Sequence, residues 1–152
     1  MLGSWDHRNF KFANPRKVDR WVILNFSRAN EQQVAQFADK LIQVGNIHGM
    51  AIQPYLFYRG MNRPRDEDVR RAFEEIFIKY KPLDLVVVVF SGTTTAYKVV
   101  KTAGDLTYGV STQGVEDKNV QRISDQTVSN ILLKINTKLG GRNFLLSPSN
   151  AL

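Results

Sequence analysis

Side chains suited to holding a phosphate group recur in the second half of the sequence. Two pairs are each four residues apart, Tyr97 with Lys101 and Lys134 with Lys138, and Gln113 lies between the pairs. On a helix, residues four apart share a face, and an aromatic ring beside a cation suits a stacked base with its phosphate. Three ammonium groups and one amide can hold a doubly charged phosphate, each charged hydrogen bond contributing about 1.5 to 3 kcal/mol. Either pair alone is more often an ordinary surface or helix-end feature.

A run of small residues, Ser91 to Thr95 (SGTTT), precedes the first pair. Around Gly92 the backbone N–H groups can approach an anion or a base edge closely. In an open parallel sheet, ligands bind at the carboxyl ends of the strands. We expect Ser91 to Thr95 to follow one strand end and Thr112 to Gly114 to follow another. Both loops, and the five side chains above, are then predicted to line one rim of the sheet.

Other kinds of site find little support in the sequence. The chain has no cysteine, which excludes disulfides, thiolate zinc sites and a cysteine nucleophile. Neither GxGxxG nor GxxxxGK[ST] is present. The two histidines, His7 and His48, fall in predicted loops and are weak candidates for ligands or bases. The acidic run Asp66 to Asp68 is better explained as charge at a helix start than as a metal site. We expect no metal and no cofactor.

The net charge of +7 and the pI of about 9.8 favour an anionic partner, although a merely solubilising basic surface explains them as well. No apolar run approaches the roughly 18 to 20 residues of a membrane-spanning helix, and the N-terminus lacks the apolar middle of a signal peptide. These features predict a protein of the cytoplasm, or also of the nucleus, with no membrane partner.

Hydrophobic periodicity predicts alternating strands and helices. The predicted strands cover residues 21–27, 50–54, 83–90 and 108–115, and residues 58–65 are predicted as a surface loop. The predicted helices begin at Glu31, at Asp66, at Tyr97 and at Ser124 or Asp125. Leu83 to Phe90 (LDLVVVVF) is apolar on both faces, as in a central strand covered by helices on each side. The expected fold is therefore α/β, a Rossmann-like open and mainly parallel sheet of about four strands with helices on both faces.

Between Phe90 and Gly141 the chain contains the strings SGTTTAYKVVK, GVSTQGVEDKNVQR and SNILLKINTKLGG. In residue type, order and spacing this segment resembles the MID domain of eukaryotic Argonautes. The upstream WVILNFSRAN and GMAIQP segments extend the resemblance over nearly the whole chain. It implies a module that binds the 5′ phosphate and first nucleotide of a small guide RNA, with nucleoside monophosphates as minimal ligands. It also implies that the module catalyses no reaction, because slicing in the family belongs to a separate PIWI domain of the same parent chain.

The resemblance assigns roles to individual residues. The ring of Tyr97 is expected to stack on the first base and to border the phosphate, and the loop before it is expected to contact that base through Gly92 and Thr94. The phosphate contacts it implies are Tyr97, Lys101, Gln113, Asn119, Lys134 and Lys138. Some relatives use a metal ion in place of the first helix lysine, and Lys134 argues against a metal here. The chain departs from the common animal pattern at Ser91, Thr93 and Thr95, where prolines and a lysine are frequent. It also departs at Gly114, where that pattern often has a cysteine.

The resemblance also divides the chain. Residues 1–20 are expected to be a linker or entry segment, residues 21–146 the MID domain, and residues 147–152 a tail leading to a PIWI domain that this chain does not include. Two other functions stay open from the residues alone. One is a small α/β enzyme acting on a nucleotide or phosphate ester through Lys101 or a hydroxyl of residues 91–95. The other is a protein-binding scaffold that uses the loop 58–65.

Overall fold

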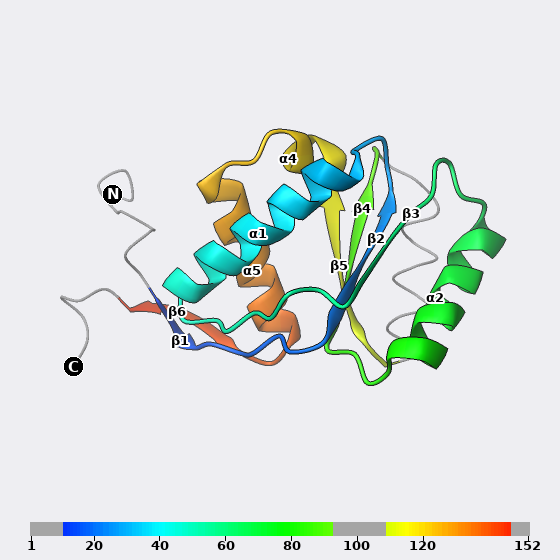
Figure 1. Cartoon of the computed structure of the whole chain (residues 1–152). Coiled ribbons are helices and arrows are strands. Elements are labelled where there is room, and N and C mark those ends of the chain that lie inside the picture. Colours follow the sequence, from blue (N-terminus) through cyan, green and yellow to red (C-terminus); the bar gives the residue numbers. More distant parts are fainter. Residues whose placement is uncertain (1–10, 93–108, 147–152) are drawn as a thin grey trace.

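The computed structural model describes residues 11–92 and 109–146 (Figure 1). Its centre is a four-stranded sheet in the order β3-β2-β4-β5, in which every neighbouring pair is parallel. Five of the six residues of β4 are buried aliphatic side chains, as expected of a central strand. The strands are β2 (Trp21–Phe26), β3 (Phe57–Gly60), β4 (Leu85–Phe90) and β5 (Ser111–Glu116).

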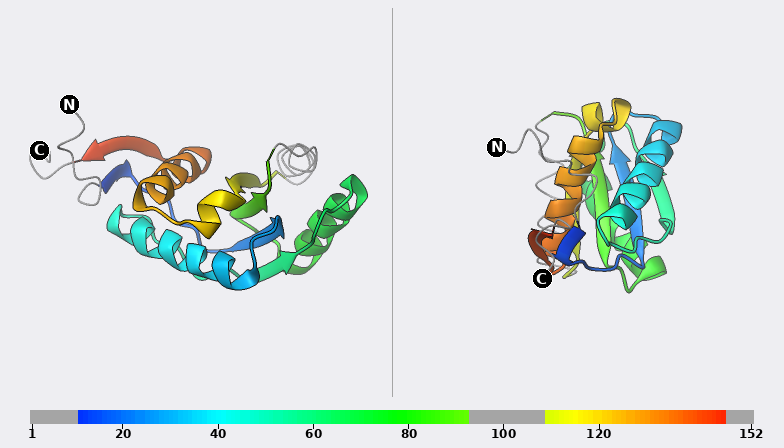
Figure 2. Two further views of the ribbon diagram at one scale, coloured as in Figure 1. Left: turned by 90° about the horizontal axis from the view of Figure 1, so that it is seen from above. Right: turned by 90° about the vertical axis from the view of Figure 1, so that its left-hand side faces the viewer.

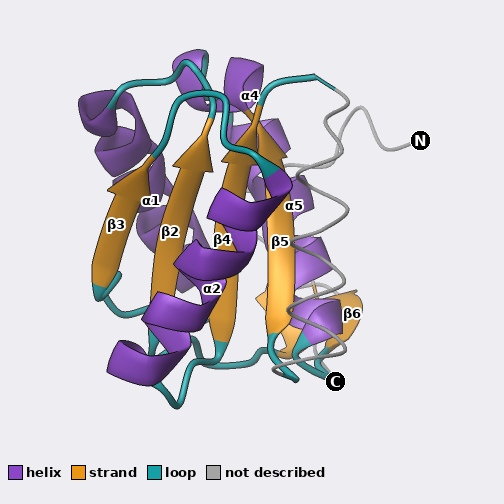
Figure 3. Cartoon of the chain, turned by 90° about the vertical axis from the view of Figure 1, so that its right-hand side faces the viewer, coloured by secondary structure: helices purple, strands orange, loops and turns teal. Residues whose placement is uncertain are grey.

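Helices cover both faces of this sheet, which confirms the predicted fold class (Figure 3). On one face α1 (Glu31–Ile47), α4 (Asp117–Gln121) and α5 (Asp125–Lys138) pack against alternate strand residues such as Val87 and Val115. On the other face α2 (Asp66–Tyr80) packs against Val86 and Val88. Successive side chains of a strand point to opposite faces, so β2, β3 and β4 each contribute to both apolar clusters.

The helices begin where the sequence provides partners for their free N–H groups. At α1 the Gln33 amide donates to Asn30 Oδ1 at 2.8 Å, and the Asn30 amide donates to Gln33 Oε1 at 3.0 Å, a reciprocal capping box. At α5 the Thr127 amide donates to Ser124 Oγ at 3.2 Å. Three acidic residues fill the first turn of α2, where the helix dipole favours negative charge.

A two-stranded ribbon that the sequence did not predict lies beyond the ends of α1 and α5, away from α2 (Figures 1 and 2). It pairs β1 (Lys11–Asn14) with β6 (Arg142–Leu146) in antiparallel fashion. Next to it, the buried Asn136 of α5 accepts from the Arg16 amide through Oδ1 at 2.8 Å. The residues joined by this bond are 120 positions apart, so no local pattern could have revealed it.

The prediction of a strand over residues 50–54 was wrong, and part of the predicted loop 58–65 is a strand. Within residues 50–54 only Ile52 makes a β-bridge. Its partner is Val18, and the bridge belongs to none of the strands. Met50 and Ile52 are buried because they pack beneath α1 and α5, outside the main sheet. The strand beside β2 is β3, whose residues are half-buried or exposed. An edge strand needs little apolar surface, which is why its sequence resembled a loop.

The buried Asn25 organises the turn between β2 and α1. Its Nδ2 donates to the Ala29 carbonyl at 2.7 Å and to the Tyr58 hydroxyl at 3.0 Å, and its Oδ1 accepts from the Ser27 amide and hydroxyl. Replacing Asn25 by alanine is expected to lower the free energy of unfolding by about 1 to 3 kcal/mol, because its partners lose their hydrogen bonds. These partners are the buried Ala29 carbonyl and the half-buried Ser27 and Tyr58.

Urea denaturation of the Asn25→Ala chain measures this loss. Asn46→Ala is a matched control on the exposed side of α1, and its effect should stay within about 0.5 kcal/mol. Equal stabilities of the two variants would show that the Asn25 network contributes nothing to the fold.

Candidate functional site

The structure joins two of the predicted phosphate ligands directly. Lys138, the last residue of α5, lies against β5, and its Nζ donates to Gln113 Oε1 at 3.0 Å and to the Thr112 carbonyl at 2.7 Å. The Gln113 side chain is only 4% exposed, and its Nε2 donates to the Gly114 carbonyl at 2.9 Å. The hydrogen bond of Nε2 to the Gly114 carbonyl and that of Oε1 to Lys138 Nζ together fix the orientation of the Gln113 amide, with its oxygen toward the ammonium group.

Strand register explains why Gln113 meets α5. Gln113 pairs with Val87 in the middle of the β4–β5 ladder, so its side chain falls on the same face as Val87 and Val115, where α5 packs. Helix α5 follows α4, and its last turn reaches the beginning of β5, where Ser111 Oγ donates to the Lys138 carbonyl at 3.4 Å. The prediction that residues 112–114 form a loop at the carboxyl end was wrong, because these residues lie within β5. The Gln113–Lys138 contact thus lies alongside an edge strand.

Two other predicted ligands lie on neighbouring elements. Lys134 is one helical turn before Lys138 on α5 and is exposed. Asn119 lies in α4, which directly follows the carboxyl end of β5, and is half-buried. The remaining predicted contacts, Tyr97, Lys101 and Thr94, lie outside the described residues.

At the carboxyl edge of the sheet, the predicted base-contact loop begins with Ser91 and Gly92. Gly92 has a φ of +59°, in the left-handed region that favours glycine, and it is exposed. The Ser91 hydroxyl donates to Asp117 Oδ2 at 2.6 Å. Sequence reasoning missed Asp117. Its signal in the sequence was weak, because Ser91 directly follows a predicted strand but Asp117 comes two residues after the predicted end of the strand 108–115.

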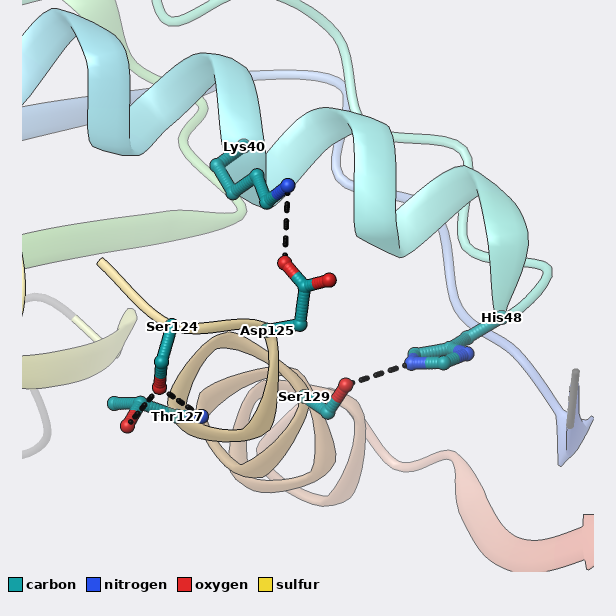
Figure 4. Close-up of polar contacts among 6 residues, drawn as sticks. All are labelled: Lys40, His48, Ser124, Asp125, Thr127 and Ser129. Atoms are coloured by element: carbon teal, nitrogen blue, oxygen red, sulfur yellow. Dashed lines mark hydrogen bonds and ion pairs between the residues drawn. The ribbon is translucent and has the colours of Figure 1, made fainter. Parts of the chain in front are cut away.

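The buried His48 is a packing residue that links two helices (Figure 4). It caps the C-terminus of α1 and is fully buried, with Nε2 3.0 Å from Ser129 Oγ of α5 and its ring 5.4 Å from that of Phe12. Nearby, Lys40 of α1 forms an ion pair with Asp125 of α5 at 2.9 Å (Figure 4). These contacts fix the position of α5, and hence of Lys138, against α1.

In the described part of the chain, the titratable groups outside this region do not form a competing metal site. Within residues 11–92 and 109–146, no three histidine, aspartate or glutamate side chains gather as a metal site would require. Asp68 accepts from the Arg65 amide at 2.9 Å, as a residue at a helix start does. Burial raises the pKa of Tyr55, helped by the negative charges of Glu31 and Asp39, far along the chain from the Gln113–Lys138 contact. In the same described ranges, no helix is both long and apolar enough to cross a membrane.

Comparison with known families gives two matches along the chain. The model of the Mid domain of argonaute matches residues 1–78, and the model of the Piwi domain matches residues 84–151. The first alone covers half of the chain. Neither match tests the division into residues 1–20, 21–146 and 147–152, which stays a prediction.

Solved structures with the same fold include Argonaute MID domains. The MID domain of Arabidopsis thaliana AGO5 has a TM-score of 0.74 and 26% identity over 90% of this chain and 99% of that one. The MID-PIWI structure of N. crassa QDE-2 has a TM-score of 0.71 and 29% identity over 88% of this chain, which spans only 38% of that one. Kluyveromyces polysporus Argonaute with a guide RNA shares the fold, with a TM-score of 0.76 at 18% identity, over 93% of this chain and 18% of that one. The family match, the shared parallel sheet and the Argonaute MID domains among its structural neighbours together show that this chain belongs to the family of Argonaute MID domains.

Proposed function

We propose that this chain holds the 5′ phosphate and first nucleotide of a small guide RNA. The observation that carries the proposal is the contact of Lys138 with Gln113, because these two residues, far apart in sequence, are both assigned to the phosphate by the Argonaute resemblance. A structural neighbour of the chain is an Argonaute with a guide RNA. Membership of the MID-domain family also supports the proposal.

The chemistry of the contact suits a phosphate. An ammonium group is a compact point charge with three donors, and the Gln113 oxygen and Thr112 carbonyl orient it before any ligand arrives. Lys134 adds a second positive charge one turn away on the same helix. Pre-organised donors of this kind bind an anion without the cost of ordering flexible side chains at that moment.

The proposed complete site includes residues beyond this contact. Tyr97 would stack on the first base, and Lys101 and Asn119 would add phosphate contacts, as the family resemblance implies. Stacking of one base on an aromatic ring contributes about 1 to 3 kcal/mol. Gly92 would present its backbone to the base edge, since its exposed turn leaves the main chain accessible.

In this proposal the chain makes and breaks no bond. It would anchor the guide for a PIWI domain of the same parent protein, where slicing would take place. The match of the Piwi model to residues 84–151 and the MID-PIWI structure of N. crassa QDE-2 support an association of the two domains.

The enzyme alternative has one observation in its favour, the Ser91 hydroxyl hydrogen-bonded to the Asp117 carboxylate. An activated serine ordinarily needs a base that a third group orients, and donors placed for the developing negative charge. Within the described residues, Asp117 is the only group that we find hydrogen-bonded to Ser91. We therefore place the binding function first.

Nucleoside 5′-monophosphates should bind through their phosphate. In an NMR titration of the chain, we expect a monophosphate to shift the amide signals around Gln113 and Lys138, and the matching nucleoside, which lacks the phosphate, to shift them much less. The binding should weaken as salt is added, because the contact is largely ionic. Equal shifts from nucleoside and monophosphate would refute the proposal.

A further inference from the structure

The Ser91–Asp117 hydrogen bond continues the β4–β5 ladder by one step. The parallel register ends with Phe90 opposite Glu116, so Ser91 and Asp117 are the next residues on their chains. Beyond this point the backbones separate, because β5 runs directly into α4 while β4 enters the turn at Gly92. A side-chain hydrogen bond connects the two segments at this point, with Ser91 Oγ 2.6 Å from Asp117 Oδ2. That distance is typical of a hydroxyl donating to a charged carboxylate, one of the stronger hydrogen bonds in proteins.

The Gly92 turn is exposed. Among the described residues, no atom lies within 4 Å of the place where the Cβ of residue 92 would stand, so none of them packs against the turn from that side. Asp117, by contrast, starts a helix that the buried Val120 holds against the core. The hydrogen bond therefore connects an exposed turn to a firmly packed element.

We propose that Ser91 and Asp117 are positioning residues that fix the Gly92 backbone in the orientation from which it reads the first base, and so set the base selectivity of the site. This inference rests on the function proposed above and deepens it. It assigns Asp117 no contact with the ligand. The carboxylate acts through Ser91, and the phosphate contact of Lys138 lies elsewhere, alongside β5.

The test measures the dissociation constants of the four nucleoside 5′-monophosphates and takes the ratio of the weakest to the tightest. We expect Ser91→Ala and Asp117→Ala to lower this ratio at least about threefold. Losing a charged hydrogen bond changes an equilibrium constant by roughly tenfold, and only part of that change is expected to affect the binding of the base. Asp117→Asn should restore most of the selectivity, since an amide oxygen accepts the same hydrogen bond. A role of the Asp117 charge alone would not be rescued in this way.

Ser124→Ala is the matched control for the loss of a serine hydroxyl. Ser124 caps α5, so its replacement should lower stability, but it lies outside the Ser91–Asp117 pair and should leave the ratio unchanged (Figure 4). An equal fall of the ratio in Ser124→Ala would show that stability alone controls selectivity, and would overturn the inference. A wild-type chain that binds all four monophosphates equally would overturn it too.

Failure of the proposed function gives a different result. If monophosphates do not bind the wild-type chain better than nucleosides do, both ideas are wrong. If they bind in a phosphate-dependent way while Ser91→Ala and Asp117→Ala keep the wild-type ratio, only the positioning role is wrong.

Discussion

Replacing Lys138 by alanine is expected to weaken the binding of nucleoside 5′-monophosphates by at least about tenfold, because one charged hydrogen bond of about 1.5 kcal/mol or more is lost. The Lys138 ammonium is held by Gln113 Oε1 and the Thr112 carbonyl, so its removal takes away a positioned charge. The loss should be largest at low salt, where the ionic contribution is greatest.

The matched control for Lys138→Ala is Lys79→Ala. Lys79 is also an exposed lysine in the last turn of a helix, but its helix, α2, covers the opposite face of the sheet (Figure 3). Both variants lose one unit of positive charge, so a general effect of net charge would weaken binding equally in both. Titration of the four monophosphates against wild type, Lys138→Ala and Lys79→Ala decides the matter. Unchanged binding by Lys138→Ala would exclude Lys138 from the phosphate site.

The largest loss of stability is expected from Phe73→Ala, at about 3 to 5 kcal/mol. Phe73 is fully buried between α2 and the sheet, in a cluster with Val22, Leu24 and Val86. Its ring stacks with that of Phe77, and the two ring centroids are 6.4 Å apart. Alanine would remove the ring and leave a cavity that the surrounding strands can close only in part. In the described part of the chain, α2 is the helix that covers this face of the sheet. Losing the Phe73 contact therefore weakens the packing of α2 on the sheet.

Ile78→Ala serves as the control on the same helix. Ile78 is 72% exposed, so truncating it removes little buried surface and should change stability by no more than about 0.5 kcal/mol. Urea denaturation of the two variants measures the difference. A loss below about 1 kcal/mol for Phe73→Ala would mean that α2 does not pack on the sheet as described.

The residues of the candidate site were recognised unevenly from the sequence. The types and spacing of Gln113, Lys134 and Lys138 were visible as strings, and the family that those strings resemble is confirmed. The position of Gln113 was not visible, because a short polar segment such as STQG can be read either as a strand or as a loop. Only the ladder with β4 places it within β5 and beside α5. Asp117 was missed because its hydrogen-bond partner, Ser91, is 26 residues away in the sequence.

The amino-acid pattern alone predicted which segments are helices with one buried face and which strand is central, because burial leaves a periodic pattern that a single segment displays. The regular apolar spacing in α1, α2 and α5 and the run of valines in β4 are such patterns. Which segments pair became visible only in the folded chain. There β3, and not the segment 50–54, pairs with β2, and β1 pairs with β6. Ser91 is hydrogen-bonded to Asp117, and Lys138 to Gln113. The reason is that pairing depends on contacts between residues far apart in the chain, and the pattern within one segment does not record its partner.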